Sequence, residues 1–81
     1  MNVTVRYFAG AREACGREAE TIVVPRGATV EDVGRLLAER HVAIRPLLPR
    51  VRFAVGERFV PPGTALRDGD TVALIPPVSG G

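Results

Sequence analysis

The residues best suited to chemistry stand at the end of the printed chain, which reads Pro76-Pro77-Val78-Ser79-Gly80-Gly81. Glycine has no Cβ, so the walls of a partner's slot can close tightly around Gly80 and Gly81. A backbone carboxyl at Gly81 would be ionised at neutral pH and able to attack the α-phosphate of ATP, forming an acyl-adenylate. A frayed chain end is the alternative, because termini are commonly disordered. The dipeptide alone leaves both interpretations open.

Length and composition predict one small globular domain. When a chain of 81 residues folds, it buries only about 60–65% of the surface that the unfolded chain exposes, so the core must be small. No apolar run approaches the ~20 residues that span a bilayer, so we expect a cytoplasmic protein without a membrane partner. Cys15 is the single cysteine, which excludes an internal disulfide and a cysteine-based zinc site.

All eleven basic residues are arginine, and the formal net charge is +2. Coding bias explains the absence of lysine most simply. The alternative is functional, since a chain with an activated carboxyl would have no lysine amine to capture it. A net charge of +2 gives too weak a field to indicate a nucleic-acid partner without further support.

The hydrophobic periodicity predicts an α+β fold. Residues 2–9 alternate, with Val3, Val5 and Tyr7 on one face and Phe8 on the other. Thr29 can cap a main helix that ends near residues 40–41. Further strands are expected over residues 20–24, 51–55, 58–60 and 71–75, with a turn or one helical turn over residues 10–16.

One helix packed on one face of a mixed sheet of about five strands satisfies this order. The first and last strands would pair in parallel, which is the ubiquitin-like β-grasp arrangement. Residues 1–75 would form the domain and residues 76–81 a flexible Gly-Gly tail.

Four segments resemble those of the molybdopterin synthase small subunits, a ubiquitin-like family of sulfur carriers. They include Val5-Arg6-Tyr7-Phe8-Ala9 with Arg12-Glu13, Ala28-Thr29-Val30, residues 66–73 and the terminal hexapeptide. The hexapeptide is the most specific, because thiazole-pathway carriers also end in Gly-Gly but usually lack the Pro-Pro-Val lead. The family often has asparagine where this chain has Gly56, and both residues tolerate the positive φ of a tight turn.

This resemblance implies a mechanism in which the partners supply the catalytic side chains. A ubiquitin-activating-like adenylyltransferase would use ATP to adenylate Gly81, and a sulfur donor enzyme would convert it to a thiocarboxylate. The tail would then enter the large subunit of molybdopterin synthase and give its sulfur to the pyranopterin precursor of the molybdenum cofactor. The resemblance implies a small subunit of a heterotetramer, without a catalytic centre, bound cofactor or metal of its own.

The tail and a docking surface have separate expected roles. Pro76 and Pro77 cannot donate ladder hydrogen bonds, so the last strand should stop there. Val78 would anchor at the mouth of a channel, Ser79 would follow it, and Gly80 would occupy the narrowest part. The resemblance implies that three further residues form the partner-docking surface: Phe8, Phe59 and Ile75. The alternative is that they close a second, minor core under the loops.

Other candidate residues favour structural roles. Cys15 lies among small residues, which indicates a packed, inert thiol. His41 is the only histidine and lies at a helix end, where a charged or capping role is commoner than catalysis. Asp68 and Asp70 should shape a turn around Gly69. The densest basic run, Arg45, Arg50, Arg52 and Arg58, indicates a solvated face or a contact with an acidic partner.

Three other functions remain open at this point. The first is sulfur transfer in thiazole synthesis or tRNA thiolation, which would use the same carboxyl with different partners. The second is a ubiquitin-like modifier joined to target proteins. The third is a basic β-grasp module that binds RNA; the chain lacks the interleaved surface aromatics that readers of single strands use.

Overall fold

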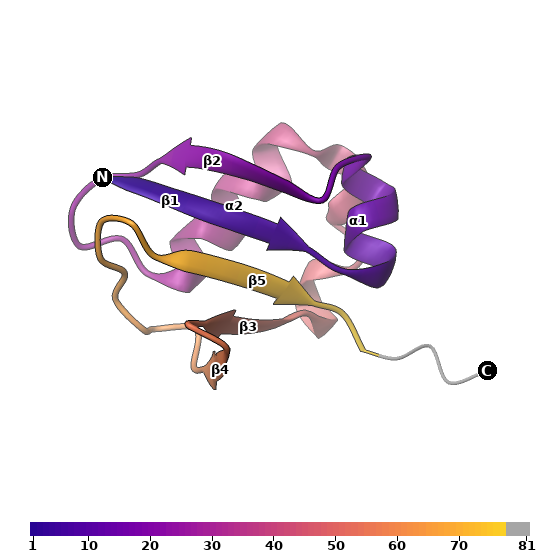
Figure 1. Ribbon diagram of the computed structural model, residues 1–81. Helices are drawn as coiled ribbons and strands as arrows, with labels where there is room; N and C mark the ends of the chain where they lie inside the picture. Colours follow the sequence, from indigo (N-terminus) through magenta and orange to yellow (C-terminus); the bar gives the residue numbers. More distant parts are fainter. Residues whose placement is uncertain (78–81) are drawn as a thin grey trace.

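A computed structural model describes residues 1–77 and has one mixed sheet packed on one main helix (Figure 1). The predicted α+β, β-grasp arrangement is confirmed. Within residues 1–77, no helix has both the length and the apolar character needed to cross a membrane. In chain order the elements are β1 (Asn2–Tyr7), α1 (Ala9–Cys15), β2 (Ala19–Val23), α2 (Val30–Arg40), the 3-10 helices η1 (Val42–Ile44) and η2 (Leu48–Arg50), β3 (Arg52–Val55), β4 (Arg58–Val60) and β5 (Thr71–Ile75).

The first and last strands lie side by side in the middle of the sheet. The strand order is β2-β1-β5-β3-β4, and β1 pairs with β5 in parallel, with Val5 opposite Val72. The other neighbouring pairs are antiparallel. Parallel strands need a long crossover, which the segment containing α2 provides. The end of β5 therefore emerges from the centre of the sheet (Figure 1).

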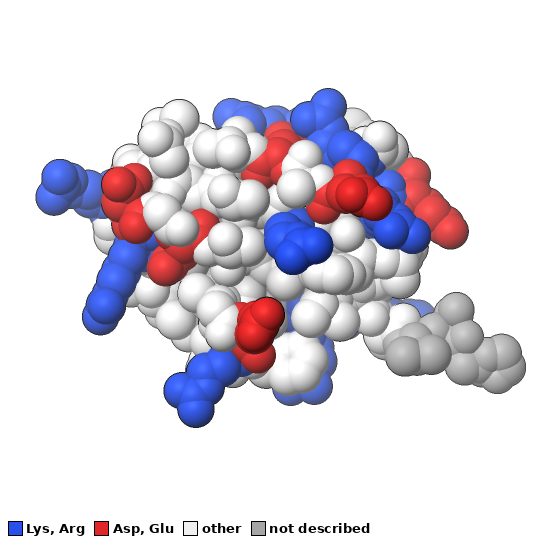
Figure 2. Space-filling model, in the orientation of Figure 1, with Lys and Arg blue, Asp and Glu red and all other residues white. Residues whose placement is uncertain are grey.

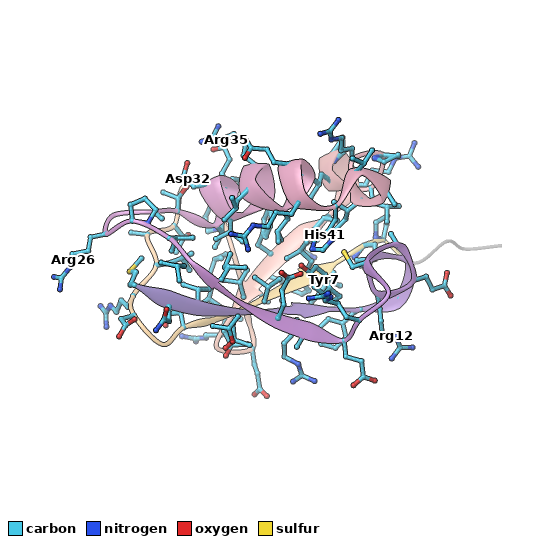
Figure 3. The ribbon with its side chains drawn as sticks, turned by 90° about the horizontal axis from the view of Figure 1, so that it is seen from above. Tyr7, Arg12, Arg26, Asp32, Arg35 and His41 are labelled. Carbon is cyan, nitrogen blue, oxygen red and sulfur yellow. The ribbon has the colours of Figure 1, made fainter. Side chains whose placement is uncertain are left out.

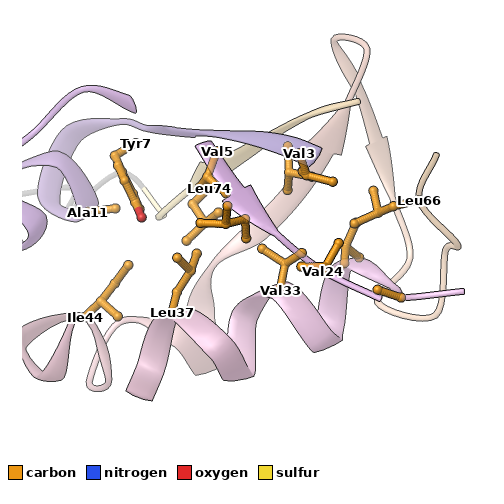
Figure 4. Packing of buried hydrophobic residues seen from close by; sticks show 14 residues of the cluster. Val3, Val5, Tyr7, Ala11, Val24, Val33, Leu37, Ile44, Leu66 and Leu74 are labelled. Carbon is orange, nitrogen blue, oxygen red and sulfur yellow. The ribbon is translucent and has the colours of Figure 1, made fainter. Parts of the chain in front are cut away.

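One face of the sheet packs on α2 and contains the core. Alternate residues of β1 and β5 meet the apolar stripe of α2, in which Val30, Val33 and Leu37 are fully buried. Leu36, beside Leu37 in the sequence, is half-buried. Ile44 of η1 closes the core beside Ala11 and Tyr7 (Figure 4).

The prediction for residues 8–16 was wrong in two respects. β1 ends at Tyr7 rather than at residue 9, and the following residues form α1, a helix of seven residues instead of one turn. Its C-cap is Gly16, with a φ of 69°, and the Gly16 N–H donates to the carbonyl of Arg12. Ala11 is fully buried, so packing against the core stabilises a helix too short to form alone.

Side-chain hydrogen bonds fix the start of α2 and the turn before β5, as the sequence predicts. The Asp32 N–H donates to Thr29 Oγ1 (3.2 Å) and the Thr29 N–H to the Asp32 carboxylate (2.9 Å), a reciprocal capping box. In the turn before β5, the Asp68 carboxylate accepts from the Asn2 N–H at 2.7 Å. The Asp70 carboxylate accepts from the Arg67 N–H at 2.8 Å. The Asp68 bond ties the turn before β5 to the start of β1, and the Asp70 bond holds the turn itself.

A polar network joins β1, β2 and the end of α2. The buried Tyr7 donates its hydroxyl hydrogen to Glu20 Oε2 at 2.7 Å, and His41 Nε2 lies 2.6 Å from the same oxygen. Figure 3 shows Tyr7 and His41 close together between the sheet and the helix layer, and their rings meet edge to face. His41 is therefore a structural partner of a carboxylate rather than an isolated helix cap.

Burial and hydrogen bonding act in opposite directions within this network. Burial raises the pKa of the Cys15 thiol, which agrees with a packed, inert cysteine. Burial alone would raise the pKa of Glu20, but the hydrogen bonds from Tyr7 and His41 outweigh it and hold that pKa below its usual value. Because the folded-state pKa is depressed, ionised Glu20 stabilises the fold above its unfolded pKa of about 4.3, and this contribution disappears as pH falls through the folded value.

Replacing Glu20 should therefore change the pH dependence of stability. We expect Glu20→Gln to lower the free energy of unfolding at pH 7 by on the order of 1–3 kcal/mol, since the partners lose a charged acceptor. The variant should also lose less stability than the wild type on acidification below pH 5, and Tyr7→Phe should show an intermediate change. Urea unfolding across pH 3–8 tests this; a wild-type pH profile for Glu20→Gln would contradict it.

Candidate functional site

The face of the sheet opposite α2, called here the far face, carries the predicted docking residues. Across its middle the strands align Arg6 with Ala73, Ala73 with Ala54, and Ala54 with Phe59. Directly opposed residues of neighbouring strands share a face, so these four side chains form one row. Figure 2 views this side, where uncharged atoms cover much of the sheet between charged side chains.

Phe8, Phe59 and Ile75 come together on this face although they are far apart in the sequence. All three line one hollow of about 450 Å³. Phe8 is 39% exposed and Phe59 is 53% exposed, while Ile75 is half-buried. Two aromatic rings this exposed do not form a minor core beneath loops. They are the kind of exposed apolar cluster that marks an interaction surface.

The β3–β4 hairpin determines where Phe59 lies. Gly56 and Glu57 both have positive φ, 56° and 66°, which is the conformation of a two-residue hairpin turn. The turn places Phe59 opposite Ala54. The interpretation of Gly56 as a residue that suits this turn is confirmed by its φ.

Sequence reasoning missed that arginines cover the two aromatic rings. The Arg6 guanidinium lies 5.4 Å from the centre of the Phe8 ring, and the Arg52 guanidinium lies 3.7 Å from that of Phe59. The alternation in β1 and the β3–β4 register could have located both pairs. Sequence proximity had instead grouped Arg52 with other arginines in one basic run.

The structure divides that basic run between surfaces. Arg58 pairs with Val55, whose side chain packs on the core side, so Arg58 and Arg52 belong to opposite faces. Arg45 donates from Nε to the Ala38 carbonyl at 2.7 Å, at the end of α2. The arginines of this run therefore do not share one face of the sheet.

The base of the tail adjoins the far-face hollow. β5 ends at Ile75, as the two following prolines predict, and Ile75 lines the hollow. Pro76 is buried and Pro77 is exposed. The remaining predicted site residues, Val78, Ser79, Gly80 and Gly81, lie outside the described residues.

The chain matches known proteins over its whole length. The ThiS family matches residues 5–81. The molybdopterin synthase sulfur carrier subunit of Chlamydomonas reinhardtii is 39% identical, and the alignment covers both chains completely. A structure described as the putative molybdopterin converting factor subunit 1 of Pyrococcus furiosus has a TM-score of 0.86 at 34% identity, over 96% of this chain and 99% of that one.

The chain belongs to the ThiS family.

Two other relatives of this ThiS-family chain have differing descriptions. The small archaeal modifier protein 3 of Haloferax volcanii is 36% identical, with both chains covered completely. A complex of subunits 1 and 2 of the molybdopterin-converting factor of Helicobacter pylori contains a chain with a TM-score of 0.73 at 26% identity, again with complete coverage of both chains.

If Phe59 serves recognition, its removal should hardly affect folding. We expect Phe59→Ala to change the free energy of unfolding by less than about 1 kcal/mol. Leu74→Ala, which empties the core on the other side of the sheet, should cost about 2–5 kcal/mol. Denaturant unfolding of the two variants makes the comparison. Similar losses for both would restore the minor-core interpretation.

Proposed function

We propose that this ThiS-family chain is the sulfur-carrier subunit of a molybdopterin synthase. Its Gly81 carboxyl is adenylated, converted to a thiocarboxylate and consumed as the sulfur source for the pyranopterin precursor. The full-length similarity to proteins named molybdopterin synthase sulfur carrier subunit supports this proposal. We also place the protein in the cytoplasm, where thiols such as Cys15 stay reduced.

The position of β5 is the observation that carries the proposal. β5 is central in the sheet, its last residue lines an exposed apolar hollow, and the chain continues from there into the tail. A protein docked on the far face therefore meets the start of the tail at the same place. Docking can then direct the tail, as positioning of a reacting group requires.

The reacting atoms in this proposal belong to the backbone, and the partners supply the catalysis. An adenylyltransferase forms the mixed anhydride between the Gly81 carboxylate and AMP from ATP, releasing pyrophosphate. A persulfide sulfur from the donor enzyme then attacks the carbonyl carbon, and AMP leaves. A second thiol of the donor enzyme then attacks the donor-side sulfur of the resulting acyl disulfide, forms a disulfide with it and releases the thiocarboxylate. The thiocarboxylate is a softer nucleophile than the original carboxylate.

The large subunit is proposed as the partner that receives the loaded tail. The Helicobacter pylori complex of subunits 1 and 2 contains a chain with this fold, which supports a two-subunit assembly. In this chain Phe8, Phe59 and Ile75 would dock on the large subunit. Pro77 and Val78 would lead Gly80 and Gly81 into its active site.

A bulky residue near the chain end should block this transfer. Gly80→Leu should leave unfolding unchanged, because residue 80 follows the last strand, but sulfur transfer by the variant should fall to background. Ser79→Ala, a small change beside it, should keep transfer within a few-fold of wild type. Single-turnover conversion of the pyranopterin precursor with the large subunit measures both. Normal transfer by Gly80→Leu would refute threading of the tail.

A protein-modifier function is the second candidate, because a small archaeal modifier protein is 36% identical over its full length. The absence of lysine limits this function. Without side-chain amines, copies of this chain cannot be joined through lysine into polymers, so a modifier of this sequence would be attached singly through its carboxyl. Isopeptide-linked conjugates that contain this chain would favour this candidate.

A further inference from the structure

The far-face hollow has a low centre because its middle residues are alanines. Ala73 and Ala54 are paired between Arg6 on one side and Phe59 on the other. Phe8 and Ile75 also line the hollow. A methyl-lined centre within a rim of larger side chains can admit an apolar side chain from another protein, which is how interface anchors are commonly buried.

Two arginines supply positive charge at and beside the hollow. Arg6 lines it, and Arg52 lies next to it, over the Phe59 ring and opposite Ile75. Within residues 1–77, no ion pair involves Arg6 or Arg52, and Glu57 is the only carboxylate that lines the hollow. Each guanidinium lies over an aromatic ring. Stacking uses the face of the guanidinium, and its N–H edges remain suited to bidentate contact with a carboxylate.

We propose that the far face recognises a protein surface in which one bulky apolar side chain lies between two carboxylates. The apolar side chain enters the hollow over Ala73 and Ala54, and the carboxylates pair with Arg6 and Arg52. This inference rests on the proposed function, because it describes what the large subunit must present to this chain. It makes Arg6 and Arg52 the residues that select the partner, with the aromatic rings as their supports.

A protein partner fits this surface better than a nucleic acid does. Bases of single strands stack on open aromatic faces, but the Arg52 guanidinium is 3.7 Å from the centre of the Phe59 ring and occupies its face. Two arginines also neutralise few phosphates, and an apolar hollow contributes nothing to binding of a phosphate backbone.

Binding of the purified large subunit of molybdopterin synthase, measured by titration calorimetry at low and high salt, tests the inference. Arg6→Gln and Arg52→Gln should each weaken binding by on the order of tenfold and reduce its salt dependence. Arg52→Glu should weaken it further, because a carboxylate would then face a carboxylate. Arg26→Gln, which removes the same charge away from the hollow, should bind like the wild type.

The hollow is tested separately by filling it. Ala73→Leu should weaken binding by on the order of tenfold, whereas Ala43→Leu, which adds the same bulk to an exposed alanine of η1 away from the hollow, should not. Thermal unfolding confirms that each variant is folded.

Wild-type affinity in both the arginine variants and Ala73→Leu would overturn the inference while leaving the carrier function intact. No binding by the wild type would contradict both the inference and the proposed partner. Binding of single-stranded RNA that depends on Arg52 would overturn the inference in favour of a nucleic-acid partner.

Discussion

The parallel pairing of β1 with β5 is the interaction on which the rest of the structure depends. It brings Val5 and Val72 to the same side of the sheet, where both are fully buried against α2. Because side chains alternate along a strand, this register also decides what faces away from α2. A shift of one residue would bury Arg6 and expose the core valines. The same pairing makes β5 a central strand, so the chain leaves the sheet beside the far face.

Within residues 1–77, the helices cover one side of the sheet and leave the far face open. α2 covers one side, and α1 with η1 closes the end of the core at Ala11 and Ile44. The other side has alanines at its centre and arginines over its exposed aromatic rings. An exposed apolar cluster of this kind promotes aggregation in a domain that works alone, but it suits a domain that docks on other proteins.

Much of the fold follows from local patterns in the sequence. The alternation around Val72 and Leu74 predicts β5 with its observed bounds, and Thr29 predicts the start of α2. The helical length of α1 could not be read in the same way, because burial of Ala11 by distant residues stabilises it. The contact of Glu20 with His41 joins residues 21 apart, and no spacing rule reveals it. The docking residues were predicted from resemblance, whereas the contact of Arg52 with Phe59 required the register between β3 and β4.

In the proposed function, the reacting group is the backbone carboxyl of Gly81. Intact mass spectrometry after incubation with ATP, an adenylyltransferase and a sulfur donor tests it most directly, followed by fragmentation to locate the change. We expect exchange of one oxygen for sulfur, confined to Gly81 and absent when ATP is withheld. An unchanged mass with active adenylyltransferases of this family, or sulfur located on Cys15, would contradict it.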